Sequence, residues 1–539
     1  MAEPTIQLGG GNWAGKSDNL LGYYKEGERF YKQDFTFSRS TTGTYTDSEG
    51  YIQEMPYNLA SYSEDYTNSL QGASTTFGTI TSPTSKLNAS TITTTANGDY
   101  KGWFKSYTLI GSTDYTFSFY VKYNNKQWLS FYHIGSNITK FDVQNGVFGS
   151  NSIGMTKEDV GDGWYRLSGT ITASSGTNYF YVYNSGQNDQ DSSIGDAFYL
   201  FGIQLVKGTS AKTYFPTTTR LNMPRVDYLN NSNGSLILEP QRSNLVTYSS
   251  DFSEWDISTE STSTMTVTPN YTTAQNGLSA SRLVATRPST DFRSIISNYV
   301  TNTNTATKSV YIKNNNAGNV DINISDQAIT VTDTWQRYEL TNNYPHATIG
   351  LRYTGAALSC DISIAGYQFE LGSYATSYIP TSGSSVTRNA DVCSITNASD
   401  RIGQTQGTLY SEFDLTEDNN FTIVEINLSN STSNRILAYR NASYIQFIVQ
   451  VGGYIEINNS TLVTFLDTNK IAITYQANNF KIYLNGSLVK TYTSGSIPSS
   501  LDTVALQDPN LQGRKQGIKS LAIFKEILTS TELETLTTL

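Results

Sequence analysis

The segment GIQLVKGTSAKTYFPT, residues 202–217, returns later in the chain as GYQFELGSYATSYIPT, residues 366–381. Three further pairs of segments precede it in the same order, namely NLASYSEDYTN (58–68) with NLVTYSSDFSEW (244–255), FSFYVKYNN (117–125) with KSVYIKNNN (308–316), and DGWYRLSGTI (162–171) with DTWQRYELTN (333–342). The offset between the copies shortens along the chain, as deletions in loops would produce. The repeat predicts two homologous domains, residues 58–219 and 244–393.

Each copy is predicted to be a β-sandwich. In YTFSFYVKY (115–123), Phe117, Phe119 and Val121 alternate with polar residues, which is the period of a strand with one face in a core. The same strand character is predicted for two further segments, YFYVYNSG (179–186) and AFYLFGIQLV (197–206). Aromatic residues make up 12% of the chain and charged residues only 15%, and long helical patterns are almost absent. Trp164 and Trp335 occupy equivalent places just before a strand, so we expect them to pack in or at the edge of the cores.

The whole chain is therefore expected to be all-β, with two jelly-roll-like modules in tandem. An N-terminal arm (1–57), a linker (220–243) and a third domain (394–539) complete the predicted organisation. The net charge is −10 without a basic block, which disfavours nucleic-acid binding. No secretory signal or membrane-spanning run is apparent. The two cysteines, Cys360 and Cys393, are expected to be buried and reduced.

The last domain has its own signals. NKIAITYQANNFKIYLNGSLVKTYTSG (469–495) predicts three strands joined by tight turns, with Asn485-Gly486 supplying the positive φ angles of a hairpin. Thr529 or Ser530 can cap a short terminal helix that carries Glu532 and Glu534 in its first turn. KIYLNGSLV and LAIFKEILTSTEL resemble parts of the concanavalin A-like, laminin-G-like jelly roll. That resemblance implies a jelly-roll fold for residues 403–539, but it assigns no calcium or sugar ligand to any position.

Three phrases join the modules: FSRSTTGTYTDSEGYIQEMPYNL (35–59), MPRVDYLNNSNGSLILEPQRSNLV (223–246) and SYIPTSGSSVTRNADVCSI (377–395). With the repeated modules, they resemble tail-fibre and other virion proteins of tailed bacteriophages, which carry carbohydrate-binding-module-like sandwiches. The resemblance implies a non-enzymatic fibre or appendage subunit whose modules bind host surface glycans. A capsid-decorating head fibre and a polysaccharide depolymerase are the alternatives.

The resemblance also implies partners and a location. The N-terminus would grip other virion proteins, the modules would bind host surface polysaccharide, and the subunit would form a homo-oligomer, most often a trimer. No membrane insertion is expected. The protein would be assembled in the host bacterial cytoplasm and released by lysis, which fits a chain without a visible export signal.

Residues 10–17, GGNWAGKS, match the phosphate-binding pattern G-x-x-x-x-G-K-[ST]. A phosphate-binding loop joins a buried strand to a helix N-terminus, whereas β-type sequence follows here, so we interpret the match as accidental. Trp13 within it is a candidate apolar anchor into a virion partner. His133 and His346 are the only histidines, and neither lies in a cluster with metal-ligand spacing, so no catalytic residues are predicted.

Candidate binding residues are of two kinds. Trp103 and Trp128 in the first module, with Tyr444 and Tyr454 in the last domain, are candidates for stacking on sugar rings. Oxygen-bearing side chains cluster in NSGQNDQDSSIGD (184–196), where a structural calcium ion is the only cofactor considered. The calcium candidates in that segment are Asn188, Asp189 and Asp191, with Asp196 nearby.

Overall fold

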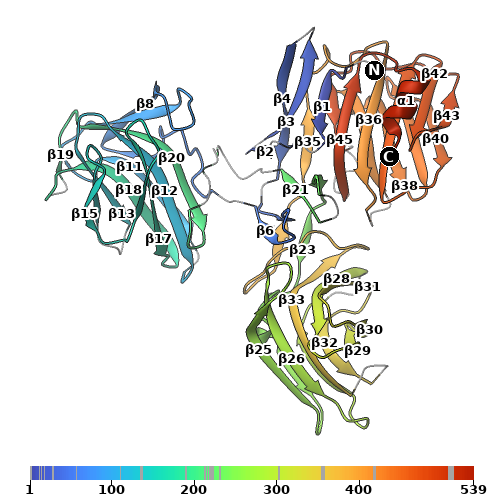
Figure 1. Cartoon of the computed structure of the whole chain (residues 1–539), viewed down its shortest axis with the longest axis horizontal. Coiled ribbons are helices and arrows are strands. Elements are labelled where there is room, and N and C mark those ends of the chain that lie inside the picture. Colours follow the sequence, from blue (N-terminus) through green and yellow to red (C-terminus); the bar gives the residue numbers. More distant parts are fainter. Residues whose placement is uncertain are drawn as a thin grey trace. The chain divides into compact units, whose positions relative to one another are not determined.

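The computed structural model describes residues 3–539 except 11–12, 14, 17–18, 27–28, 40, 56–57, 110, 134–137, 189–190, 212–213, 215–216, 218–223, 230–231, 302–303, 354–357, 417–419 and 508–514, with the backbone alone at 15–16, 19–21, 23–26 and 29–34. The regular secondary structure of the described residues is nearly all strand, with one α-helix, as the composition predicted. It divides into two compact units: Met1–Gly15, Asn19–Met55 and Met223–Leu539 form the first, and Lys16–Asp18 with Pro56–Asn222 form the second (Figure 1).

The first sandwich consists of two six-stranded antiparallel sheets. One sheet has the order β15 (Val147–Asn151), β14 (Thr139–Asp142), β13 (Trp128–His133), β18 (Gly176–Ser185), β11 (Gly102–Leu109), β7 (Leu70–Gln71). The other has the order β16 (Thr156–Asp159), β17 (Trp164–Thr172), β12 (Asp114–Tyr123), β20 (Ala197–Lys207), β9 (Ala89–Thr94), β8 (Ala73–Ile80), and a small ribbon pairs β10 (Gly98–Asp99) with β19 (Asp191–Ser192). Phe117, Phe119 and Val121 are fully buried between the sheets, which confirms the predicted alternation.

The second sandwich repeats this design with five strands in each sheet. One sheet has the order β24 (Asp256–Thr259), β27 (Arg293–Asn298), β32 (Ala347–Arg352), β29 (Val320–Ile324), β30 (Gln327–Val331). The other has the order β25 (Thr264–Thr273), β26 (Ser279–Thr286), β33 (Ser359–Leu371), β28 (Ala306–Asn314), β31 (Gln336–Asn342), with η1 (Phe252–Glu254) before the first strand and β23 (Arg242–Asn244) paired to β34 (Val386–Arg388). Trp164 is buried, and Trp335 is partly buried against a small apolar cluster, so both have the predicted packing role.

Both sandwiches contain the same β-bulge. The β12–β20 ladder shifts register beside Gly202, and the β28–β33 ladder shifts beside Gly366. These glycines have φ values of +62° and +59°, a backbone conformation that disfavours side chains. An asparagine braces each bulged strand: the Asn58 amide donates to a strand carbonyl at 3.0 Å and accepts a strand N–H at 3.0 Å, and Asn244 does so at 3.1 and 3.0 Å. The sequence repeat is therefore also a repeat of backbone geometry.

The C-terminal sandwich has one layer built around β36 and β45, which pair with each other. This layer comprises β43 (Ser487–Tyr492), β42 (Asn479–Leu484), β41 (Thr468–Gln476), β36 (Gln406–Asp414), β45 (Gln516–Phe524), and, along the far side of β45, β1 (Ile6–Gly9) and β22 (Ser235–Leu238), the latter paired to β21 (Arg225–Asp227). The second layer runs β40 (Tyr454–Leu462), β39 (Tyr444–Val451), β38 (Ser431–Asn441), β37 (Asn420–Leu428), β44 (Thr503–Ala505), β35 (Val392–Ile395), β4 (Arg29–Ser38), β3 (Asn19–Glu26).

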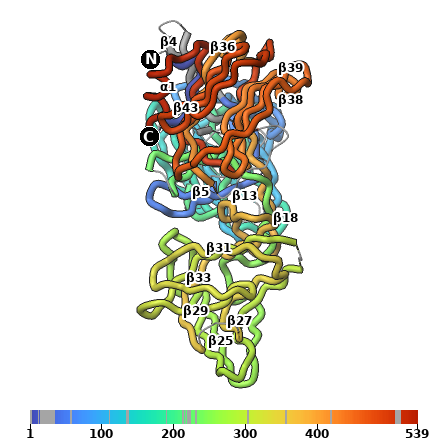
Figure 2. Tube along the Cα trace, turned by 90° about the vertical axis from the view of Figure 1, so that its right-hand side faces the viewer, coloured from blue at the N-terminus to red at the C-terminus, as the bar shows by residue number. Residues whose placement is uncertain are grey.

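The turn and helix signals of this domain are confirmed. Asn485 and Gly486 have φ values of +48° and +82° between β42 and β43. Thr529 caps α1 (Ser530–Thr537) in a reciprocal capping box with Glu532. The helix lies beside β43 in Figure 2, and the Thr537 hydroxyl accepts a hydrogen bond from the Gly486 N–H at 3.1 Å.

The N-terminal segment differs from the predicted separate arm. β1 pairs with β45 through four residues, and β3 and β4 extend the second layer of the same sandwich. Ile6 and Leu8 of β1 and Phe35 and Phe37 of β4 lie in its core. A β5–β6 hairpin (Thr44–Thr46 and Ile52–Glu54) follows. The predicted linker likewise supplies β21 and β22 to this sandwich. The C-terminal sandwich is thus assembled from three separated stretches of sequence.

Candidate functional site

One sheet of the first sandwich carries aromatic side chains on the face opposite to its core. On β18, Phe180 and Val182 are buried in the core, while Tyr179 and Tyr181 alternate with them and remain partly exposed. The strand register then places Tyr181 directly between two further aromatic residues, Phe104 on β11 and Tyr132 on β13. We call this surface the tyrosine face and define it as Tyr100, Phe104, Tyr132, Tyr179 and Tyr181; the Tyr183 ring, which is fully buried, contacts Tyr100 from within the sandwich.

The rings of the tyrosine face touch one another across three strands. The Phe104 ring centroid lies 4.7 Å from that of Tyr181, and Tyr132 lies 5.6 Å from Tyr181. Phe104 also stacks on Tyr179 at 5.9 Å with an interplanar angle of 9°. Contact distances of this size are typical of favourable aromatic pairs. The result is a continuous aromatic surface whose partly exposed rings have no core to cover.

Tyr100 enters this surface from a loop rather than from a strand. Its φ of +59° is unusual for a bulky residue. In that conformation its ring lies 5.5 Å from Tyr132, 5.4 Å from Tyr181 and 5.2 Å from Tyr183. Strained residues of this kind concentrate at binding sites, where the surrounding contacts hold them in place.

The phenols of this surface are hydrogen-bonding groups at neutral pH. Burial, and after it the neighbouring phenols, raise the pKa of Tyr181, and burial followed by Tyr132 raises the pKa of Tyr100. Burial raises the pKa of the neighbouring Tyr183 further above its ordinary value. Protonated phenols can donate and accept, and their rings offer flat apolar planes. This combination suits a ligand with apolar faces and hydroxyl edges, as a sugar ring has.

At the paired strand positions that the structure describes, the second sandwich has no such aromatic row. The residue that takes the place of Tyr181 by register is Gly350, which pairs with Ile295 on β27 and with Asn323 on β29. The aromatic row Phe104–Tyr181–Tyr132 of the first copy is therefore Ile295–Gly350–Asn323 in the second. Since the two scaffolds share their bulges and sheet order, the aromatic row belongs to the surface of one copy and is not required by the fold.

The two tryptophans predicted to contact sugars, Trp103 and Trp128, lie on opposite faces of this sheet. Trp103 is only 2% exposed and packs on Phe117 at 5.6 Å, so its prediction as a sugar contact is wrong: it points into the core. Trp128 shares the strand face of Tyr132, four residues away, and is partly exposed over Gly149. Trp128 therefore extends the tyrosine face towards β15.

The remaining predicted site residues lie apart from this surface. Tyr444 and Tyr454 are 41% and 79% exposed on β39 and β40 of the C-terminal sandwich. Asn188 and Asp191 are exposed, and Asp189 lies outside the described residues. Among the residues that the structure describes, no group of three histidine, cysteine or acidic side chains is placed to hold a metal ion.

Trp13 has an intramolecular position. Its indole packs on the core of the C-terminal sandwich and its Nε1 donates to the carbonyls of Asn233 and Gly234 at 3.1 and 3.2 Å. The anchor hypothesis expected it to bind a partner instead. Much of GGNWAGKS lies outside the described residues, but Gly15 and Lys16 form β2 and the chain continues as strand β3 rather than as a helix. A phosphate-binding loop requires a helix N-terminus there.

The histidines and cysteines have structural roles. His133 is buried against Phe180, its Nε2 lies 3.1 Å from Asn178 Oδ1, and burial lowers its pKa. His346 lies in a loop of the second sandwich between Tyr299 and Tyr344. Both cysteine thiols are free and buried, as predicted, and burial raises the pKa of Cys360 to about 12. The one described α-helix is too short to cross a membrane.

The three joining phrases meet in the unit that holds the second and C-terminal sandwiches. Each contributes side chains to a fully buried charge cluster of Arg39, Arg225, Glu239, Arg388 and Asp391. Asp391 lies 2.8 Å from Arg39 and 2.5 Å from Arg225, and Glu239 lies 2.9 Å from Arg225 and 2.8 Å from Arg388. Although burial opposes ionisation, Arg388 and Arg225 hold the pKa of Glu239 well below its ordinary value.

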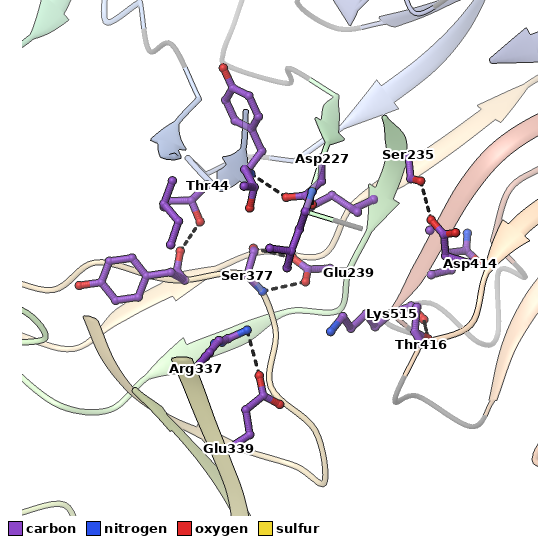
Figure 3. A pocket seen from close by; sticks show the side chains of 18 of the residues that line it. Thr44, Asp227, Ser235, Glu239, Arg337, Glu339, Ser377, Asp414, Thr416 and Lys515 are labelled. Atoms are coloured by element: carbon purple, nitrogen blue, oxygen red, sulfur yellow. Dashed lines mark hydrogen bonds and ion pairs between the residues drawn. The ribbon is translucent and has the colours of Figure 1, made fainter. Parts of the chain in front are cut away.

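A pocket of about 300 Å³ lies beside this cluster (Figure 3). Arg337 pairs with Glu339 at 3.0 Å, and Ser377 donates to Glu239 at 2.7 Å. Asp227 accepts backbone N–H groups at 2.6 and 2.9 Å, and Lys515 donates to a backbone carbonyl at 3.1 Å. These charged side chains already pair with one another or bond to the backbone. We therefore interpret the pocket as part of the packing between the second and C-terminal sandwiches and not as a ligand site.

One buried cation gives a pH-dependent prediction. The Lys308 ammonium is held by the Asn342 carbonyl and side chain at 3.0 and 2.7 Å and lies 4.5 Å from the Phe369 ring. Burial lowers its pKa from 10.5 to about 8. Between those values the unfolded chain binds more protons than the folded chain, so stability rises with pH there. We expect the unfolding free energy of the wild type to rise relative to that of Lys308→Met between pH 8 and 10, measured by urea unfolding; parallel profiles would contradict this.

No family model matches the chain, and no curated protein sequence matches it. Solved structures with similar folds include the CBM40 of the Ruminococcus gnavus IT-sialidase bound to α2,3-sialyllactose, at 16% identity, 25% of this chain, 84% of that chain and a TM-score of 0.22. A tandem CBM22 pair from Paenibacillus barcinonensis Xyn10C matches at 11% identity, over 59% of this chain and 98% of that chain, with a TM-score of 0.19. These are β-sandwich carbohydrate-binding modules, and likenesses this low leave the ligand to be argued from the residues above.

Proposed function

We propose that this chain is a non-enzymatic adhesion protein whose first sandwich binds glycans through the tyrosine face. The observation that carries the proposal is the aromatic row Phe104–Tyr181–Tyr132, which is present on one copy of a duplicated scaffold and replaced on the other. Aromatic planes beside a few polar groups are the usual composition of a small-molecule binding surface. The protonated phenols supply the hydrogen bonds that sugar hydroxyls need.

We propose a bacteriophage virion as the setting of this activity. The support is the resemblance of the three joining phrases to those of phage appendage proteins. The chain would be a tail-fibre or appendage subunit, most often a trimer, that gains avidity from several weak sites. A capsid-decorating head fibre would use the same surface, and imaging of labelled particles distinguishes the two positions. Failure to release reducing sugar from bound polysaccharide separates both from a depolymerase.

Replacing Tyr181 by alanine tests the binding surface. The Tyr181 ring contacts Phe104, Tyr132 and Tyr100, so its loss removes the centre of the aromatic surface. We expect the affinity for the best glycan on an array of bacterial surface polysaccharides to fall about 10- to 30-fold, measured by isothermal titration calorimetry.

Tyr271→Ala is the matched control, because Tyr271 is a 48% exposed tyrosine on β25 of the second sandwich, outside the tyrosine face. It should leave the affinity unchanged. Equal losses in both variants, or no binding by the wild-type chain to any glycan, would refute the proposed site.

A further inference from the structure

We infer that the second sandwich carries its own binding pocket for an uncharged saccharide, built differently from the tyrosine face. This inference rests on the proposed glycan-binding function and extends it to a second site. The pocket encloses about 720 Å³ and opens between the β29–β30 turn, the loop after β31 and the end of β32. We call it the arginine pocket and define it as Phe292, Asp326, Gln327, Tyr344, Arg352 and Tyr353.

Arg352 organises this pocket. Its Nε lies 3.1 Å from Asp326 Oδ1, and its Nη1 donates to the Tyr344 hydroxyl at 2.8 Å. The guanidinium carbon lies 5.1 Å from the Phe292 ring centre and 5.7 Å from that of Tyr344. The side chain is therefore fixed by two rings and two polar partners. Among the described residues Nη2 makes no hydrogen bond, which leaves the two N–H groups of this nitrogen for a ligand.

Exposed rings form the apolar part of the pocket. Phe292 is 46% exposed and Tyr353 is 63% exposed, and both line the pocket. The amide of Gln327, also exposed, adds a donor and an acceptor. The pocket thus combines rings that can stack on the apolar face of a sugar with polar groups that can bond to its hydroxyls. Its volume is ordinary for a small-ligand site.

The charges in the pocket favour an uncharged saccharide over an acidic one. The positive charge of Arg352 is matched by the Asp326 carboxylate 3.1 Å away, so an acidic sugar would meet that carboxylate while gaining little from the arginine. A neutral saccharide pays no such cost. The pocket is also a hollow at the end of a sheet, whereas the tyrosine face lies on the middle strands of one, so the two sites would contact different parts of a glycan.

The test uses saturation-transfer difference NMR on the full chain with the methyl glycosides of glucose, galactose, mannose and N-acetylglucosamine, and with the methyl glycoside of galacturonic acid, whose carboxylate is free, as the acidic probe. In a Tyr181→Ala background, which disables the tyrosine face, at least one neutral glycoside should still receive saturation. Adding Tyr353→Ala should lower that signal at least fivefold, while adding Tyr271→Ala should not change it. Both are exposed tyrosines, so loss of fold does not explain a difference between them.

The outcomes separate the two proposals. Wild-type binding that Tyr181→Ala abolishes completely would overturn the second site and leave the proposed function intact. Binding that Tyr353→Ala alone abolishes, with no effect of Tyr181→Ala, would refute the tyrosine face and support the arginine pocket. No signal from the wild type with any probe would refute both sites for these sugars. Stronger saturation of the galacturonic acid glycoside than of the neutral glycosides in the Tyr181→Ala chain would overturn the assignment to neutral saccharides.

Discussion

Replacing Asp391 by alanine is expected to lower the free energy of unfolding by about 3–5 kcal/mol, because it removes the carboxylate that pairs with buried Arg39 and leaves Arg225 to share Glu239 with Arg388. Asp391 is fully buried and pairs with Arg39 and Arg225 through its two oxygens. It also accepts the Glu239 backbone N–H at 2.9 Å. Urea unfolding or calorimetry of the full chain measures the loss. We expect it to appear in the transition of the unit that contains the second and C-terminal sandwiches.

Asp361→Ala is the control for this experiment. Asp361 forms an equally short ion pair with Arg282, at 2.5 Å, but the two side chains are 19% and 35% exposed. Pairs near the surface contribute about 0–1 kcal/mol because water solvates both charges in any case. Similar losses for the two variants would show that the buried cluster does not hold the joint together.

Replacing Trp103 by alanine is expected to destabilise the first sandwich by about 3–5 kcal/mol, the usual cost of removing a buried aromatic side chain from a core. Trp103 contacts Phe117, one of the fully buried residues of β12, so its loss leaves a cavity between the two sheets. Urea unfolding monitored by circular dichroism measures the effect.

Trp128→Ala is the companion variant on the same sheet. Its indole lies on the outer side over Gly149 and is partly exposed, so we expect a smaller loss of stability than for Trp103→Ala. Because the Trp128 ring extends the tyrosine face, we also expect Trp128→Ala to lower the glycan affinity. Equal destabilisation by the two variants would contradict the assignment of one to the core and the other to the surface.

Local patterns predicted the elements well. The alternation in residues 115–123, the Asn485-Gly486 turn and the Thr529 cap each depend on neighbours a few positions away, and the structure confirms all three. The sequence also contained a signal for the tyrosine face, since Tyr179, Tyr181 and Tyr183 alternate with Phe180 and Val182. Such a strand has large apolar or aromatic residues on both faces, and only one of these faces can fill a core along its whole length.

Distant pairings explain what was missed. The tyrosine face joins residues from a loop and three strands, and no local period reports that β18 lies between β11 and β13. Trp103 and Trp128 both begin or border aromatic strands, so their directions follow only from the register of the sheet. The charge cluster brings together Arg39 and Asp391, which are 352 positions apart, and the phrases that carry them give no sign that they meet.

The pairing of β1 with β45 sets the order in which the molecule is completed during synthesis. Thr5 donates to the carbonyl of Ile523, across 518 positions of chain. At roughly 5–20 residues per second, a ribosome needs on the order of 25 to 100 s to cover that distance. Both repeated sandwiches emerge within that interval, so each has time to fold before β35, the later partner of β4, and β45, the later partner of β1, have been synthesised. The sandwich that contains the first strand of the chain is therefore the last to close.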